Sequence, residues 1–145
     1  MKKVKGAKLF EDSEVKPTNF ADDGVYTEYV IEGIIPGLNS DKGLMRSHWS
    51  KVKKEKDKYK WLIKSQMVDS NALKHSGEVM VVYTGYKSRF MDWDNFCSSF
   101  KHIGDALVSL GIIVDDSPEY IVEFIPKQTK CKRDDQKVVI RVIPL

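Results

Sequence analysis

Residues 95–110 read Asn-Phe-Cys-Ser-Ser-Phe-Lys-His-Ile-Gly-Asp-Ala-Leu-Val-Ser-Leu, and Gly111 follows them. Large apolar side chains recur there every three or four positions, which is the spacing that places them on one face of an α-helix. The residues of this face are Phe96, Phe100, Ile103, Leu107 and Leu110. Gly111 stands where a helix commonly ends in a left-handed residue. The stretch therefore predicts one amphipathic helix whose apolar side lies in the core.

Apolar segments on either side of this helix predict strands. Residues 79–83 read Val-Met-Val-Val-Tyr, a nearly continuous apolar run that is typical of a strand covered on both faces. Residues 25–35 are rich in β-branched and aromatic side chains, and a Pro-Gly pair ends them. Residues 120–125 and 138–143 predict two final strands, which we expect to form a hairpin.

A second helix is predicted across residues 47–73, which contain neither proline nor glycine. Apolar side chains recur there at helical spacing, and lysines fill the other faces. The apolar positions are Trp49, Val52, Tyr59, Ile63 and Met67. In chain order the elements are strand, helix, strand, helix, strand and strand. This order predicts an α+β domain in which a small mixed β-sheet packs with two main helices.

Length and composition predict one domain of an intracellular, cytoplasmic protein that does not bind a membrane. The chain has 145 residues, with 24 lysines and arginines against 21 acidic residues and a formal net charge of +3. This length is enough for one hydrophobic core. Cys97 and Cys131 are too few for a disulfide scaffold, and no apolar stretch has the length of a signal peptide or membrane helix. Polar residues 1–24 predict a partly flexible arm before a single domain at 25–145.

Residues 91–95, Met-Asp-Trp-Asp-Asn, contain the first acidic pair, Asp92 and Asp94. In an extended backbone, side chains two positions apart project to the same side. Two close carboxylates suit a hard cation such as Mg²⁺, which offsets their repulsion. The alternative is that Asp94 or Asn95 caps the next helix while Asp92 is solvated. By the same alternation, Trp93 points the other way and is expected in the core.

The polar face of the helix at 95–110 carries Lys101 and Asp105, two and three turns after Asp94. Asp94 itself is expected just outside this helix. Lys101 could reach a phosphate held near the carboxylates, or it could form an ion pair with Asp105 four residues later. For an isolated pair of this kind, the ion pair is the commoner outcome. His102, which adjoins Lys101, is expected at the surface.

A short apolar strand, expected at residues 112–114, leads into a second acidic pair, Asp115 and Asp116. A helix that returns the chain toward its entry segment would bring one of these carboxylates to the first pair. The alternative is an ordinary acidic turn, since a Ser-Pro pair follows.

Taken together, these motifs resemble the signature of the RusA family of Holliday junction resolvases. The residues that carry the resemblance are Asp92-x-Asp94-Asn95, a lysine, Asp105-Ala106-Leu107, Gly111 and Asp115-Asp116, and Ile35-Pro36 followed by Asn39 is similar to the element that opens that family's domain. The resemblance covers residues 30–145 loosely and 92–118 closely. The interval from Asn95 to the lysine is three residues longer here than in the family's pattern. Ser98 stands at the ungapped position and has no charge, so the role of Lys101 depends on how the helix accommodates the extra residues.

The resemblance implies a Mg²⁺-dependent homodimeric endodeoxyribonuclease, with Mn²⁺ as a substitute metal. Such enzymes resolve four-way DNA junctions in recombination and repair by two symmetric nicks, which suits a gene of phage or prophage origin. Asp92, Asp94 and Asp116 are then the catalytic, metal-binding carboxylates, and Lys101 is the phosphate-facing catalytic lysine. Asp115 is a further metal ligand on the same basis.

Basic residues of the predicted helix at 47–73, and of the connector between the last two strands, are candidates for holding DNA phosphates. They are Lys53, Lys54, Lys60, Lys127, Lys130, Lys132 and Arg133. For the helix, a solvated lysine face is an equally good interpretation. Trp93 or Trp49 could also act as a wedge at the junction. Two other functions stay open: a DNA-junction-binding protein without catalysis, and a metal-dependent nuclease that cuts flaps or replication forks.

Overall fold

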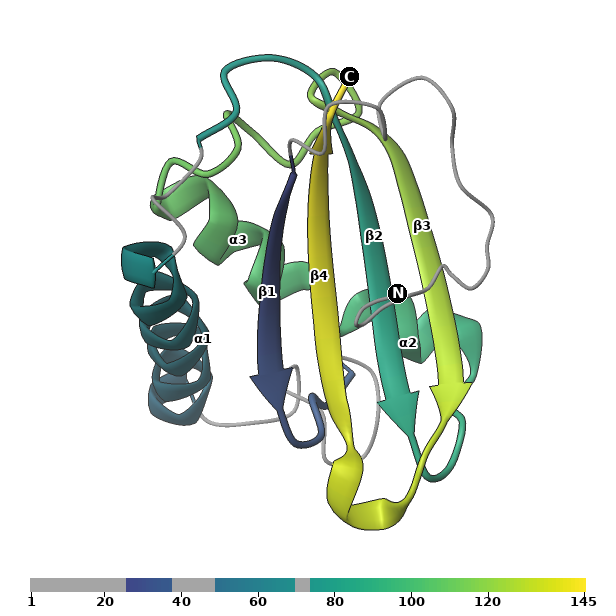
Figure 1. The fold of residues 1–145 in the computed structure, drawn as a ribbon. Coiled ribbons are helices and arrows are strands. Elements are labelled where there is room, and N and C mark those ends of the chain that lie inside the picture. Colours follow the sequence, from purple (N-terminus) through teal and green to yellow (C-terminus); the bar gives the residue numbers. More distant parts are fainter. Residues whose placement is uncertain (1–25, 38–48, 70–73) are drawn as a thin grey trace.

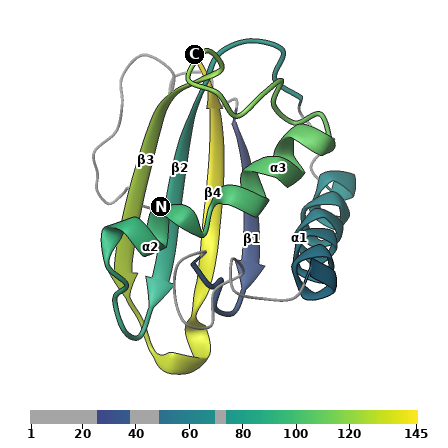
Figure 2. The same ribbon diagram turned by 180° about the vertical axis from the view of Figure 1, so that it is seen from behind.

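The computed structural model describes residues 26–37, 49–69 and 74–145, and it shows the α+β architecture that the sequence predicts. Four strands form one mixed sheet, and α2 and α3 cross one face of it (Figure 1, Figure 2). The elements are β1 (Thr27–Glu32), α1 (Trp49–Asp69), β2 (Val79–Lys87), α2 (Trp93–Ser98), α3 (Lys101–Ser109), β3 (Ile121–Lys130), the short 3₁₀ helix η3 (Arg133–Asp135) and β4 (Lys137–Pro144). The predicted arm at 1–24 and the predicted motif residue Asn39 lie outside the described residues.

The strands lie in the order β1-β4-β2-β3. β2 pairs in parallel with β3 and antiparallel with β4, while β1 pairs antiparallel with β4. The predicted hairpin of the last two strands is therefore wrong, because β2 lies between β3 and β4. The physical reason is that β2 is buried along nearly its whole length and takes an inner position, whereas β3, in which only Ile121 is buried, lies at the edge.

α2 and α3 divide what the sequence predicts as one helix over 95–110. The break falls at Ser99 and Phe100. The hydroxyl of Ser99 donates a hydrogen bond to the carbonyl of Phe96 and lies 2.8 Å from the hydroxyl of Tyr83. A serine that bonds to the backbone one turn earlier often bends a helix. The apolar face is nevertheless the expected one: Phe96, Phe100, Ile103 and Leu107 are buried, and Leu110 packs against them.

α3 ends, as predicted, before a left-handed glycine. Gly111 has a φ of 75°. Its amide donates to the carbonyl of Val108 at 3.0 Å, and the amide of Ile112 donates to the carbonyl of Leu107 at 2.9 Å. This is the hydrogen-bond pattern of a Schellman motif. The predicted short strand at 112–114 does not form, because the turn uses the amide of Ile112. The backbone there is irregular, but the side chain of Ile112 is buried in the core.

α1 lies beside the edge strand β1 and packs against α3 (Figure 1). Tyr59 and Ile63 of its apolar face are buried, but Trp49, which was expected on that face, is 70% exposed. Gln66 fastens the helix to β1, because its side-chain oxygen accepts from the amide of Val30 at 2.8 Å and its side-chain nitrogen donates to the carbonyl of Val30 at 2.7 Å. These bonds satisfy backbone groups at the free edge of the sheet.

The first strand is shorter than the sequence predicts. β1 ends at Glu32 because Gly33 adopts a φ of 94° and its amide turns to the carbonyl of Gln136 at 2.8 Å. Residue 25, where this strand was predicted to begin, lies outside the described residues. So do residues 47–48 and 70–73, the two ends of the helix predicted at 47–73. Within the described ranges, no helix has the length and apolar character that crossing a membrane requires.

Candidate active site

A short loop, residues 88–92, connects β2 to α2 and is held by side chains of β3. The side-chain oxygen of Gln128 accepts from the amide of Met91 at 2.9 Å, and its nitrogen donates to the carbonyl of Met91 at 3.0 Å. Lys130 donates to the carbonyl of Ser88 at 3.0 Å. Because these bonds reach the loop's backbone directly, they fix the start of α2 relative to the sheet.

Asp92 and Asp94 lie at this fixed start of α2. Asp92 is the N-cap residue, with φ −66° and ψ 157°, and Asp94 is the second residue of the helix. The predictions that both lie in extended backbone, and that Asp94 lies outside the helix, are therefore wrong for Asp94. The side chain of Asp92 makes no capping hydrogen bond, and both residues are exposed. Two carboxylates thus face solvent from a backbone that is held in place.

Two glycines let the first turn of α2 approach its surroundings closely. A Cβ at Gly37 would collide with the side chain of Asn95, and a Cβ at Gly85 would lie 2.5 Å from a ring carbon of Phe96. The side-chain oxygen of Asn95 is buried and has no hydrogen-bond partner among the described residues. The segment before α1 and the strand before α2 therefore both pack against the turn that carries the acidic pair.

Lys87 is a buried cation beneath α2 that the sequence analysis missed. It is 2% exposed, and its ammonium lies 5.9 Å from the centroid of the Phe96 ring. No ion pair joins it to another described residue. Burial lowers the pKa of Lys87, and the nearby thiol of Cys131 opposes that shift. In a strand, every second side chain points to the same face. If the strand predicted at 79–83 is extended to residue 87, Lys87 lies on the same face as Tyr83, which is the face that α2 covers.

Lys101 forms the ion pair that the sequence analysis favoured for an isolated pair. Its ammonium lies 3.2 Å from a carboxylate oxygen of Asp105, and 55% of the lysine side chain is exposed. The break between α2 and α3 falls in the interval from Asn95 to Lys101, so Lys101 begins a new helix. Its phosphate-facing role stays a prediction.

Asp115 and Asp116 are exposed in the irregular segment between α3 and β3. A carboxylate oxygen of Asp116 lies 3.7 Å from the position that a Cβ on Gly104 would take, so this side chain lies against the middle of α3. Asp92 and Asp94 lie instead at the start of α2. In residues 26–37, 49–69 and 74–145, no three histidine, cysteine or acidic side chains gather closely enough to hold a metal ion.

A metal site with three carboxylate ligands is therefore not assembled by the described residues. Mg²⁺ does not require one, because it commonly binds through one or two carboxylates while waters and substrate phosphates supply the other ligands. Asp92 and Asp94 are the donors that fit this chemistry, since both are exposed oxygen ligands on a fixed backbone.

Neither Cys97 of α2 nor His102 of α3 has the properties of a catalytic nucleophile or of the base that would activate one. His102, predicted at the surface, has only 12% of its side chain exposed, and its pKa is lowered by burial and by Lys56. Burial raises the pKa of Cys97, and the charge of Asp94 adds to that shift, so the thiol stays protonated near neutral pH. Cys97 is therefore a packing residue.

The predicted DNA-binding residues fall into two groups. Lys53, Lys54 and Lys60 are exposed on α1, where Lys53 pairs with Asp57 at 3.0 Å. The second group was predicted in a connector, but β3 extends further than expected and includes Lys127 and Lys130, so only Lys132 and Arg133 lie in the connection to β4. Lys130 also has a structural role, because it binds the loop before α2 and lies 4.9 Å from the ring of Phe90.

The prediction that Trp93 lies in the core is wrong. It is 54% exposed and meets the ring of Phe96 edge to face, with centroids 6.1 Å apart. The physical reason is that Trp93 begins α2, so the strand alternation that would bury it does not apply. Exposed aromatic side chains therefore lie both beside the acidic pair, at Trp93, and on α1, at Trp49.

Comparison with known proteins finds no family model that matches this sequence and no curated protein that matches it. Function is therefore inferred from the side chains described above and from the motif resemblance of residues 92–118.

Proposed function

We propose that this chain is a divalent-cation-dependent endodeoxyribonuclease that cuts branched DNA, with the four-way junction as substrate and Mg²⁺ or Mn²⁺ as cofactor. The observation that supports this proposal is the anchored start of α2, where Asp92 and Asp94 face solvent next to the loop that Gln128 holds. Catalytic groups must be held close to their productive geometry by a supporting layer of contacts. An acidic surface loop without a function has no such requirement.

The residues have separate roles in this proposal. Asp92 and Asp94 would hold the cation, which when bound activates a water molecule and offsets charge on the phosphate. Lys101 would contact the same phosphate. Its ion pair with Asp105 is exposed, and such a pair stabilises a protein by only about 0.2–1 kcal/mol, so a phosphate can displace the carboxylate. Asp115 and Asp116 would join the site only if the segment between α3 and β3 moves when DNA binds.

A homodimer is part of the proposal, because two symmetric nicks require two equivalent sites related by a two-fold axis. Sedimentation of the protein with and without a four-way junction tests this point. A single monomeric species in both conditions would contradict it.

A second candidate function is binding of branched DNA without catalysis. The observation that favours it is that the described acidic residues do not assemble a three-ligand metal site, while α1 presents many exposed lysines. In that case the lysines supply all of the affinity, and the acidic residues do not contribute to it.

Incubation with end-labelled substrates separates these functions. The panel contains a four-way junction, a flap, a fork and a linear duplex of matched sequence, each with Mg²⁺, Mn²⁺ or EDTA. The proposal predicts paired nicks in the junction with either metal and none with EDTA. Binding without cleavage under all conditions would favour the second candidate. Equal cutting of the flap, fork and junction would contradict the assigned substrate.

A further inference from the structure

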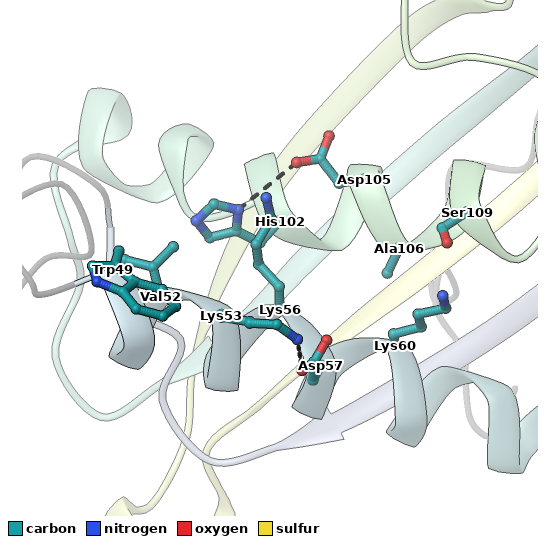
Figure 3. Close-up of a pocket in the computed structure, with 10 residues that line it drawn as sticks. All are labelled: Trp49, Val52, Lys53, Lys56, Asp57, Lys60, His102, Asp105, Ala106 and Ser109. Carbon is teal, nitrogen blue, oxygen red and sulfur yellow. Dashed lines mark hydrogen bonds and ion pairs between the residues drawn. The ribbon is translucent and has the colours of Figure 1, made fainter.

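An open groove of about 470 Å³ lies between α1 and α3 (Figure 3). Three lysines of α1, Lys53, Lys56 and Lys60, line one side of it. Their spacing of three and four residues places them on the helix face that is turned toward α3. His102 and Asp105 line the side formed by α3. The other exposed lysines of α1, such as Lys54 and Lys58, do not line the groove.

The groove keeps positive charge after its ion pairs are counted. Asp57 is paired with Lys53 at 3.0 Å, and Asp105 is paired with Lys101 at 3.2 Å. In the described part of the chain, neither Lys56 nor Lys60 has an ion-pair partner. Two ammonium groups therefore line one helix face without a carboxylate to neutralise them.

His102 and Asp105 face each other on the side of the groove that α3 forms. The Nδ1 of His102 is buried and lies 3.8 Å from the carboxylate of Asp105. Figure 3 shows Lys56 rising from α1 toward this imidazole. Lys56 thus brings a positive charge to the side of the groove that α3 forms, which suits an anion better than an apolar ligand.

An exposed aromatic ring lies at one end of the groove. Trp49 is 70% exposed and lines it, and Figure 3 shows Lys60 and Ser109 at the opposite end. Lysines that follow a backbone, together with an aromatic side chain on which a base can stack, are the usual components of a site for single-stranded nucleic acid. The volume is that of a pocket for a small molecule, so it can take about one or two nucleotides of a single strand but not a duplex.

We propose that the groove between α1 and α3 binds a single strand of DNA, with phosphates against Lys56 and Lys60 and a base stacked on Trp49. That the nucleic acid is DNA rests on the proposed function. The groove is separate from the acidic pair: Figure 2 shows α2 crossing β3 and β2, while α3 continues past β4 and β1 to α1. A branched substrate would therefore place one unpaired strand in the groove and another part of the DNA at the start of α2.

Binding of a fluorescein-labelled oligothymidine, followed by anisotropy in EDTA, tests the proposal without requiring cleavage. The double variant Lys56→Ala/Lys60→Ala should weaken binding at least about tenfold and should reduce the slope of log affinity against log salt by about 1.4, since each phosphate contact on a single strand contributes about 0.7. The matched control is Lys54→Ala/Lys58→Ala, which removes the same charge from the same helix at the same spacing. It should change affinity less than twofold. Alanine favours helix, so α1 is retained in both variants.

Two further comparisons decide between a groove and a general basic surface. Trp49→Ala should weaken oligothymidine binding about fivefold or more, whereas Trp61→Ala, which removes an equally exposed tryptophan of α1 outside the groove, should not. A blunt duplex should bind both lysine double variants equally. Equal loss of oligothymidine affinity in the two lysine variants, or in the two tryptophan variants, would overturn the proposal. Because oligothymidine binding is measured in EDTA and needs no cleavage, failure of the nuclease assignment and failure of the groove give different results.

Discussion

Two glutamines make nearly the same contacts at opposite sides of the molecule. Gln128 binds both backbone groups of Met91 and holds the loop before α2, while Gln66 binds both backbone groups of Val30 and holds α1 against β1. The elements that they hold carry opposite charge, since α2 begins with exposed carboxylates and α1 presents exposed lysines. The difference shows that the chain fixes the position of its acidic pair at the level of the backbone. The lysines extend from a helix that Gln66 holds in the same way, and they lie on long, exposed side chains.

The packing beneath the two regions differs as well. Phe96 is fully buried, stacks on Tyr83 with centroids 4.8 Å apart, and covers Gly85. Trp49 is mostly exposed. The acidic pair is thus supported by a residue of the hydrophobic core, whereas Trp49 lies on the surface of the molecule.

The largest expected effect on stability is that of Phe96→Ala. Truncating a fully buried aromatic residue costs about 3–5 kcal/mol, and here it would also release the first turn of α2. Trp49→Ala should cost much less than Phe96→Ala, because 70% of the Trp49 side chain is exposed. Urea denaturation of the two variants measures the contrast, and comparable destabilisation would show that α1 depends on Trp49 for packing.

Gln128→Ala and Gln66→Ala form the sharpest comparison between the two regions. Each leaves one backbone amide and one carbonyl without a partner, so we expect each to destabilise the protein by about 1–3 kcal/mol. Only Gln128→Ala should also slow junction cleavage, by about tenfold, because it loosens the loop that carries Asp92. Cleavage is measured under single-turnover conditions at a temperature where both variants are folded. Equal slowing in the two variants would show that the anchoring of the loop has no special role.

Acid should destabilise the protein through His75, which is buried, and His102, which is half-buried. Burial lowers the pKa of His75 below its usual 6.5, and His102 shifts in the same direction. The unfolded chain then binds more protons than the folded chain below about pH 6.5, so the free energy of unfolding falls as the pH drops through that range. His75→Gln should flatten this dependence between pH 7.5 and about pH 5. An unchanged profile would assign the effect to His102.

Lys101→Ala should have only a small effect on stability. Its exposed pair with Asp105 predicts a loss below about 1 kcal/mol. Cleavage should nevertheless slow while junction binding is retained, if Lys101 contacts the phosphate. An unchanged cleavage rate would transfer that role to another cation, and Lys87→Met then tests the buried lysine beneath α2.

The sequence predicts the element order, the buried face of α2 and α3, and the left-handed end at Gly111, because helical spacing and glycine chemistry are local properties. It does not predict that β2 separates β3 from β4, because strand order depends on which strand is buried most completely in the assembled sheet. At the break, the hydroxyl of Ser99 also contacts that of Tyr83, which is 16 residues earlier in the chain. Sequence spacing alone cannot show such a contact.

In the candidate site, too, the sequence predicts local features but not contacts between residues far apart in the chain. The identity of Asp92 and Asp94 as the exposed acidic pair is visible in the sequence, and so is the ion pair between Lys101 and Asp105. The anchoring by Gln128 is not visible, because it joins residues 37 positions apart. The groove is missed for a similar reason, since Lys56 and His102 come together only when α1 packs against α3.

The central claim is that the anchored acidic pair of α2 cuts branched DNA. Its most direct test is cleavage of an end-labelled four-way junction in Mg²⁺ by the unaltered protein, by Asp94→Asn, and by Asp134→Asn, which removes one exposed carboxylate from η3. Junction binding in EDTA is measured in parallel. The account predicts paired nicks from the unaltered protein and from Asp134→Asn, and cleavage reduced at least about a hundredfold in Asp94→Asn with its binding intact. Full cleavage by Asp94→Asn, or binding without cleavage by the unaltered protein, would contradict it.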